Sequence, residues 1–121
     1  MTVELSCRFG FDAAHRFEHF PEGHANRAVH GHSFQAEVTL RGEPDPATGF
    51  VLDYAVLEKT CAAVRGELDH RMLNEVEGLA KPSLENLCVW IWRRLAPRLP
   101  GLARVTVRRE SVGQSCSYTG P

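Results

Sequence analysis

Three histidines, His15, His30 and His32, have the residue type and the spacing of a metal site. His30 and His32 lie two residues apart in "VHGHSF", and residues two apart in a strand project to the same face, about 6 to 7 Å from each other. His15 ends the segment "ELSCRFGFDAAH", so it falls beside them if the two segments pair as antiparallel strands. Three imidazoles with an open fourth position are typical of catalytic zinc, which polarises hydroxyl and carbonyl groups. The alternative third ligands are His19 and His24.

Two further groups of residues are suited to proton transfer and ligand binding. Asp69 and His70 are adjacent in "ELDHRMLN", and an aspartate can fix a histidine's tautomer and raise its basicity. Adjacent residues seldom hydrogen-bond each other, so we expect the two side chains to have separate partners, or Asp69 to cap a turn. Glu110 follows "ARVTVRR", where a carboxylate can accept two hydrogen bonds from the N–H edge of a pterin or guanine ring. An ion pair with Arg108 or Arg109 is the alternative for Glu110.

The periodicity of the chain predicts the elements that position these residues. Residues 3–11 and 30–40 alternate apolar and polar side chains and predict two strands. An apolar stripe over residues 57–68, with Asp53 as its cap, predicts a helix, and a wider stripe over residues 84–95 predicts another. The segments "LARVTVRRE" and "GQSCSYTG" predict a final hairpin.

The predicted order is strand, strand, helix, helix, strand, strand, which is an α+β domain spanning residues 1–121. Two helices cover only one face of a four-stranded sheet. We expect the other face to carry enough apolar side chains to need a cover, which self-association would supply.

Composition narrows the class of protein. Fourteen Lys and Arg residues nearly balance fifteen Asp and Glu residues, so no overall field favours nucleic acid or an anionic membrane. The longest apolar run, "LCVWIW", is too short to span a bilayer, and the start of the chain lacks a signal-peptide pattern. The four cysteines form no C-x-x-C pair, which favours reduced thiols and a cytoplasmic location.

Six segments, in this order, carry a family resemblance: "FDAAHRF", "VHGHSF", "GFVLDYAVLEK", "LDHRMLN", "PSLENLCVWIWRRL" and "RRES" with "SCSYTG". They resemble 6-pyruvoyltetrahydropterin synthase and the bacterial 6-carboxytetrahydropterin synthase. The resemblance implies the tunnelling fold, in which three subunits form a barrel, two trimers stack as a hexamer, and active sites lie at subunit interfaces. It also implies roles for the residues above: zinc ligation by His15, His30 and His32, a catalytic relay through Asp69 and His70, and a pterin-ring anchor at Glu110.

One departure from the resembled family falls at Asn26. The synthases have a catalytic cysteine four residues before the first histidine of "HGH", and this chain has Asn26 there. An amide neither donates nor accepts a proton in catalysis, so we expect Asn26 to contact the substrate and His24 or His70 to take the proton.

The resemblance implies a zinc-dependent lyase that converts 7,8-dihydroneopterin triphosphate to 6-carboxytetrahydropterin, a precursor of 7-deazaguanines such as queuosine's base. Two alternatives follow from the missing cysteine. One is another pterin side-chain reaction, either retro-aldol cleavage or phosphate elimination to a pyruvoyl product. The other is an oligomer that binds pterin or zinc without turnover.

Overall fold

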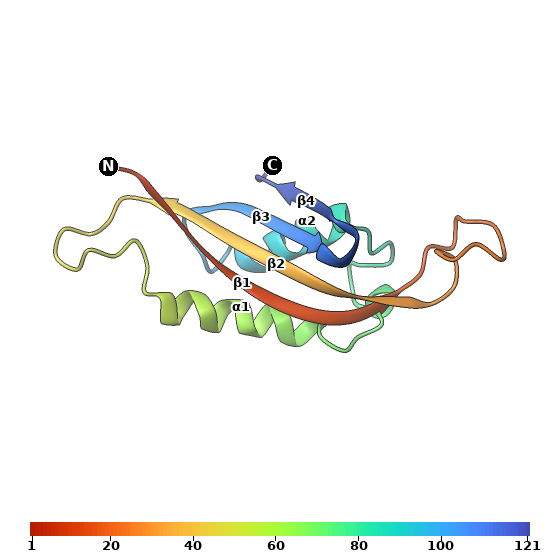
Figure 1. Ribbon diagram of the computed structural model, residues 1–121. Helices are drawn as coiled ribbons and strands as arrows, with labels where there is room; N and C mark the ends of the chain where they lie inside the picture. Colours follow the sequence, from red (N-terminus) through yellow and green to blue (C-terminus); the bar gives the residue numbers. More distant parts are fainter.

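The computed structural model describes residues 1–121 and contains one antiparallel sheet with two helices (Figure 1). The four strands lie in the order β1 (Val3–His15), β2 (His30–Gly42), β3 (Leu102–Arg109) and β4 (Gln114–Tyr118). Helices α1 (Tyr54–Leu68) and α2 (Leu84–Leu95) connect β2 to β3, with the 3-10 turn η1 (Leu73–Glu75) between them. A second 3-10 turn, η2 (Glu110–Val112), joins β3 to β4. The predicted order of elements is confirmed.

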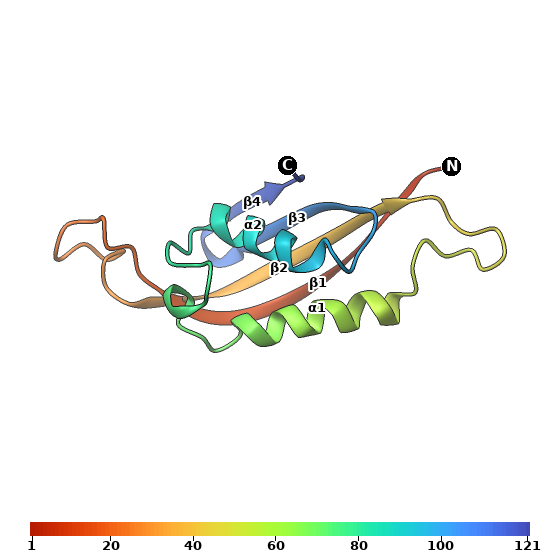
Figure 2. The same cartoon turned by 180° about the vertical axis from the view of Figure 1, so that it is seen from behind.

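Both helices begin at side-chain caps, of which Asp53 was predicted and Ser83 was not. The Asp53 side chain accepts a hydrogen bond from the Ala55 backbone N–H at 2.8 Å, and Ser83 accepts one from the Asn86 N–H at 3.2 Å. The helices pack on the same face of the sheet, α1 against β1 and α2 against β3 and β4 (Figure 2). None of the helices is long and apolar enough to cross a bilayer.

The hydrophobic core fills the space between the helices and the sheet. Alternate residues of β1, β2 and β3 point into it, among them Phe11, Phe34, Val38, Val105 and Val107. The apolar stripes of both helices meet them from the other side. The three predicted metal ligands lie on this same face of the sheet, at the end where β1 stops and β2 starts.

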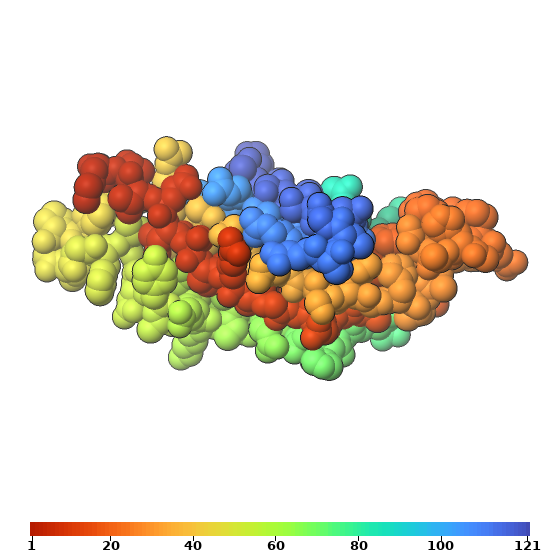
Figure 3. Space-filling view, in the orientation of Figure 1, coloured from red at the N-terminus to blue at the C-terminus, as the bar shows by residue number.

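The opposite face of the sheet is polar, so our expectation of an apolar surface there was wrong. Glu37 lies at its centre and accepts hydrogen bonds from Arg8 at 3.3 Å and from Arg108 at 3.0 Å. Further pairs on this face are Asp12 with Ser33 and Thr106 with Ser117. Figure 3 shows the strands side by side on this face, with α2 largely hidden behind them. The alternation of residue types had predicted which side chains share this face. It had not predicted that these polar side chains would be hydrogen-bonded to one another, so that the face needs no apolar cover.

The outer edge of β1 is paired only near its end. His70 donates its backbone N–H to the Asp12 carbonyl at 2.7 Å, and the Ala14 N–H donates to the Arg71 carbonyl at 3.0 Å. A parallel bridge joins Ala14 to Met72. These bonds hold residues 70–72 against β1, one strand away from the histidines on β2.

All four cysteines are free. Cys61 and Cys88 are buried in the core, and Cys7 and Cys116 are partly buried beside them. The Sγ atoms of Cys7 and Cys61 lie 3.4 Å apart, and the Cys88 thiol donates to the Cys116 carbonyl at 3.0 Å. The thiols therefore serve as small core side chains, as predicted.

Candidate metal centre and active site

The pairing of β1 with β2 brings the three histidines together. His15 lies directly opposite His30, and His32 lies opposite Ala13, two residues along the same face. One ligand nitrogen from each histidine falls within 4.8 Å of the other two. His19 and His24, the alternative third ligands, belong to the loop over residues 16–29 that extends away from the sheet (Figure 1). The cluster therefore contains His15, as the antiparallel pairing predicted.

Backbone carbonyls set the orientation of two of the rings. His15 donates its Nδ1–H to the Pro82 carbonyl at 3.0 Å, and His30 donates its Nδ1–H to the Ala28 carbonyl at 2.8 Å. This tautomer leaves the Nε2 lone pair of each ring free, which is how second-sphere hydrogen bonds orient metal ligands. The Nε2 atoms of His15 and His32 are buried without a hydrogen-bond partner. Buried unpaired acceptors are costly, so this donor set fits a bound cation.

Burial also keeps the cluster in the form that binds metal. Desolvation lowers the pKa of His15 to about 4, although its hydrogen bond to the Pro82 carbonyl opposes the shift. Desolvation lowers the pKa of His32 as well, and the charge of Arg109 adds to the effect at both rings. Neutral imidazole is the ligand form, so the folded chain holds these two rings ready for a cation at neutral pH.

The metal-free protein is expected to lose stability in mild acid because of His15, whose side chain is only 1% exposed. Its pKa is about 4 in the folded chain and 6.5 ordinarily, so between these values the unfolded chain binds a proton that the folded chain does not. The free energy of unfolding should fall by up to about 3 kcal/mol from pH 6.5 to 4. Urea unfolding of the metal-free protein at pH 7, 5.5 and 4 measures this fall.

A His15→Gln variant, unfolded under the same conditions, isolates the histidine from carboxylates that titrate in the same range. Its free energy of unfolding should fall less steeply with decreasing pH than that of the wild type. Parallel curves for the two proteins would contradict the assignment.

Asp69 and His70 are hydrogen-bonded to each other, contrary to our expectation for adjacent residues. His70 has a φ of +59°, and this left-handed backbone turns its Nδ1 back to 3.0 Å from Asp69 Oδ2. The other carboxylate oxygen, Oδ1, accepts the Asp12 backbone N–H at 3.0 Å. That bond, together with His70 and Arg65, holds the pKa of Asp69 below its ordinary value. The aspartate is thus an ionised acceptor that leaves Nε2 of His70 free to take a proton.

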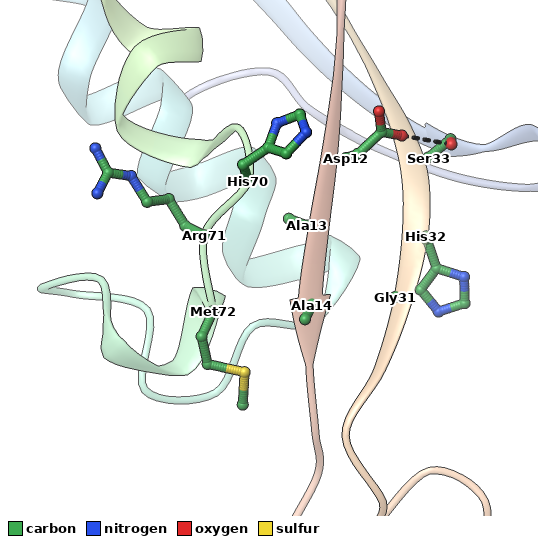
Figure 4. Close-up of a pocket in the computed structure, with 9 residues that line it drawn as sticks. All are labelled: Asp12, Ala13, Ala14, Gly31, His32, Ser33, His70, Arg71 and Met72. Carbon is green, nitrogen blue, oxygen red and sulfur yellow. Dashed lines mark hydrogen bonds between the residues drawn. The ribbon is translucent and has the colours of Figure 1, made fainter.

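A surface pocket of about 580 Å³ includes residues of both groups, His32 and His70. Figure 4 shows His70 on the segment along the outer edge of β1, and His32 on β2 beyond that strand. The Asp12 carboxylate, bonded to Ser33, lies in the pocket wall between them. Strand β1 therefore runs between the two histidines within one subunit.

The remaining predicted residues lie apart from the three-histidine cluster. Glu110 begins η2 immediately after β3; its carboxylate is exposed and forms no ion pair, so the expected alternative of pairing with Arg108 or Arg109 is absent. Asn26 and His24 lie in the 16–29 loop, where the Asn26 backbone N–H donates to His24 Nδ1 at 3.0 Å. The structure does not bring either of them to the metal cluster.

One functional candidate, Arg109, was missed in the sequence. It ends β3 on the helix-facing side, in line with the buried Val105 and Val107. A charged residue at an apolar position of an alternating strand is the signal that identifies it, and "RVTVRR" carries that signal.

Comparison with known proteins adds the decisive observation. Residues 4–121 match the family profile described as 6-pyruvoyl tetrahydropterin synthase. The chain belongs to this family.

Relatives within the 6-pyruvoyl tetrahydropterin synthase family cover most of the chain. The dihydroneopterin monophosphate aldolase of Pyrococcus furiosus is 38% identical over 103 residues, which are 84% of this chain and 82% of that protein. The 6-carboxy-5,6,7,8-tetrahydropterin synthase of Synechocystis is 35% identical over 119 residues, 93% and 90% of the two chains. The solved 6-pyruvoyl tetrahydropterin synthase of Caenorhabditis elegans aligns with a TM-score of 0.87 at 28% identity, covering 100% of this chain and 97% of its own.

These matches confirm the predicted family and its tunnelling-fold subunit. The four-stranded antiparallel sheet with two helices on one face is the arrangement found in the solved synthase. The relatives are named as synthases and as an aldolase, so the prediction of a lyase is confirmed at the level of the family. Processing of a pterin side chain is the chemistry that these names share.

Proposed function

We propose that this chain is a zinc-dependent 6-carboxytetrahydropterin synthase-like lyase that acts on 7,8-dihydroneopterin triphosphate. The observation that carries the proposal is the set of three histidines, two of whose Nε2 atoms are buried and unpaired. A scaffold that only bound pterin would not need these costly acceptors. The 35% identity to the synthase of Synechocystis supports the same reaction.

His15, His30 and His32 are the residues that would hold the ion. Zinc in this site would supply Lewis acidity to the side-chain hydroxyls of the substrate and lower their pKa. The chain itself contributes the fixed orientation of the rings, through the Pro82 and Ala28 carbonyls, and a buried setting that favours neutral imidazole.

His70 is our candidate for the general base. Its Nδ1–H is held by the ionised Asp69, so Nε2 is the nitrogen that accepts a proton from the substrate side chain. Glu110, an exposed carboxylate without an ion pair, is suited to accept the N–H groups of the pterin ring. Asn26 would contact the substrate without transferring a proton. His24 accepts the Asn26 N–H at Nδ1, so Nε2 carries the hydrogen in the neutral ring, and His24 would take a proton only at Nδ1 after this bond opens.

Assembly of the chain into trimers, stacked as a hexamer, completes the proposal. Both sheet edges, β1 and β4, lack a partner strand over most of their length, and edge pairing between copies would satisfy them. Because β1 separates His70 from the histidine cluster, His70 of one subunit would serve the cluster of its neighbour. The free cysteines are compatible with the proposed cytoplasmic location.

A retro-aldol reaction is the second candidate function. Asn26 stands where the resembled synthases have a catalytic cysteine, and the relative from Pyrococcus furiosus at 38% identity is named a dihydroneopterin monophosphate aldolase. An aldolase of this kind needs the same metal site and base but a different order of proton transfers.

Identification of the product by mass spectrometry separates the candidates. We expect the zinc-loaded protein to convert 7,8-dihydroneopterin triphosphate to 6-carboxytetrahydropterin and acetaldehyde, with release of the triphosphate. A pterin shortened by retro-aldol cleavage, from the triphosphate or the monophosphate, would instead establish the aldolase. Return of both substrates unchanged, after binding, would favour the non-catalytic oligomer. Light scattering on the same sample tests the hexamer.

A further inference from the structure

Arg109 lies beside the metal-binding histidines. On β3, Val107 pairs with Ala36 of β2, so the same alternation brings Arg109 beside Phe34 at the end of the paired region. The Phe34 ring packs against His32 and His15, with ring centroids 5.5 Å and 5.7 Å away. The Arg109 side chain therefore shares the face, and the end of the sheet, that holds the histidine cluster.

The charge of Arg109 is not compensated by the protein. Its Nε is buried and has no hydrogen-bond partner, and no carboxylate lies within ion-pair distance of its guanidinium. Its neighbour Arg108, on the polar face, is paired with Glu37 at 3.0 Å. The field of Arg109 reaches the cluster, since it contributes to the lowered pKa of both His15 and His32.

An unpaired guanidinium beside a cluster of histidines, with no carboxylate in contact, makes this site deficient in negative charge. A bound divalent cation would increase the deficit, because like charges repel more strongly at a partly buried site than in water. An anionic group on the ligand corrects it. Phosphate suits this role, since the planar guanidinium donates two parallel hydrogen bonds to its oxygens.

Among the other cations near the motifs, Arg71 and Lys81 form no ion pair but are exposed to solvent, and Arg16 and Arg27 are already engaged. Arg16 forms an ion pair with Glu18 at 3.0 Å, and Arg27 donates to the carbonyls of Glu18 and Phe20. Arg109 is distinguished from them by its partly buried position and its free donors.

We propose that Arg109 binds the phosphate of the substrate side chain and makes the enzyme select phosphorylated over unphosphorylated pterins. This inference rests on the proposed function and specifies its substrate class. Arg109 is a specificity residue in this proposal and takes no part in proton transfer.

The test compares two ligands on four metal-loaded proteins. Wild type, Arg109→Gln, Arg109→Lys and Arg104→Gln are titrated with 7,8-dihydroneopterin triphosphate and with 7,8-dihydroneopterin, with binding followed by pterin fluorescence. Arg104→Gln is the matched control, because Arg104 lies on the same strand but on the polar face, opposite Thr39. Metal content and thermal unfolding of each variant establish that the site is intact, and Arg109→Lys serves if the glutamine variant does not fold.

Arg109→Gln should weaken binding of the triphosphate by about 10- to 100-fold, the range expected for a lost charge-assisted contact, and should change binding of 7,8-dihydroneopterin by less than about 3-fold. Arg109→Lys should recover part of the loss, and Arg104→Gln should match the wild type. An equal loss for both ligands, or no loss, would overturn the proposal.

If the proposed reaction is wrong, the experiment gives a different result from the one expected if only the role of Arg109 is wrong. If the wild type binds the triphosphate but does not convert it, the proposed reaction is wrong and the comparison of Arg109 variants remains valid. If the wild type binds neither pterin, both proposals are wrong.

Discussion

Replacing His30 with alanine is expected to remove the bound metal and the activity together. The variant retains only two imidazoles of the cluster, which is too few to hold a catalytic zinc ion tightly. Since Lewis-acid activation supplies several kcal/mol, kcat/KM should fall by at least about 10³-fold. His30 is preferred to His15 because its side chain is not fully buried, so its loss should disturb folding less.

Metal content by mass spectrometry and kcat/KM are measured on the same preparations. The control is His19→Ala, which removes an imidazole from the exposed loop outside the cluster and should change neither quantity. Full metal content in the His30 variant would disprove its assignment as a ligand.

Removal of the proposed general base should lower kcat while leaving the metal in place. We expect His70→Asn to reduce kcat by about 10²- to 10⁴-fold with little change in KM, the usual contribution of a positioned base. Asparagine is chosen because it tolerates the left-handed backbone at this position, where φ is +59°. Asp69→Asn should also lower kcat, because a neutral amide no longer holds the His70 ring in one tautomer.

A mixing experiment tests where His70 acts. If each site combines the histidine cluster of one subunit with His70 of another, assemblies formed from His30→Ala and His70→Asn chains should regain part of the activity. Each variant assembled alone provides the baseline. Activity no higher than that baseline would contradict a shared site, and a His70→Asn enzyme retaining more than a tenth of wild-type kcat would contradict the base itself.

The three-histidine cluster could be predicted from sequence because each step depended on a simple periodicity. Alternation in two segments identified the strands, and antiparallel pairing then required the residue that ends one strand to lie beside the residue that begins the next, His15 beside His30. The helices followed from their apolar stripes, and the start of the first followed from its cap at Asp53.

Other features depend on geometry that alternation does not express. The contact between Asp69 and His70 requires a positive φ at His70. The pattern of residue types in the sequence does not predict a positive φ at a histidine. We had expected the outer face of the sheet to be apolar and covered. Its charged side chains instead form hydrogen bonds with Glu37. Alternation in "RVTVRR" places Arg109 on the apolar side of its strand, but that this side lies beside the histidines became apparent only with the pairing of β2 and β3.

The position of the 16–29 loop has an evolutionary consequence. It leaves the sheet immediately after His15 and returns immediately before His30, so its ends are fixed by strand pairing while its middle is not. Under the proposed function, insertions or substitutions in this loop, such as Asn26 in place of the cysteine of the resembled synthases, would alter proton transfer without moving a histidine of the cluster. The histidine cluster and the loop can therefore change independently in this fold, and under the proposed function a change of product would need no change in the residues that hold the ion.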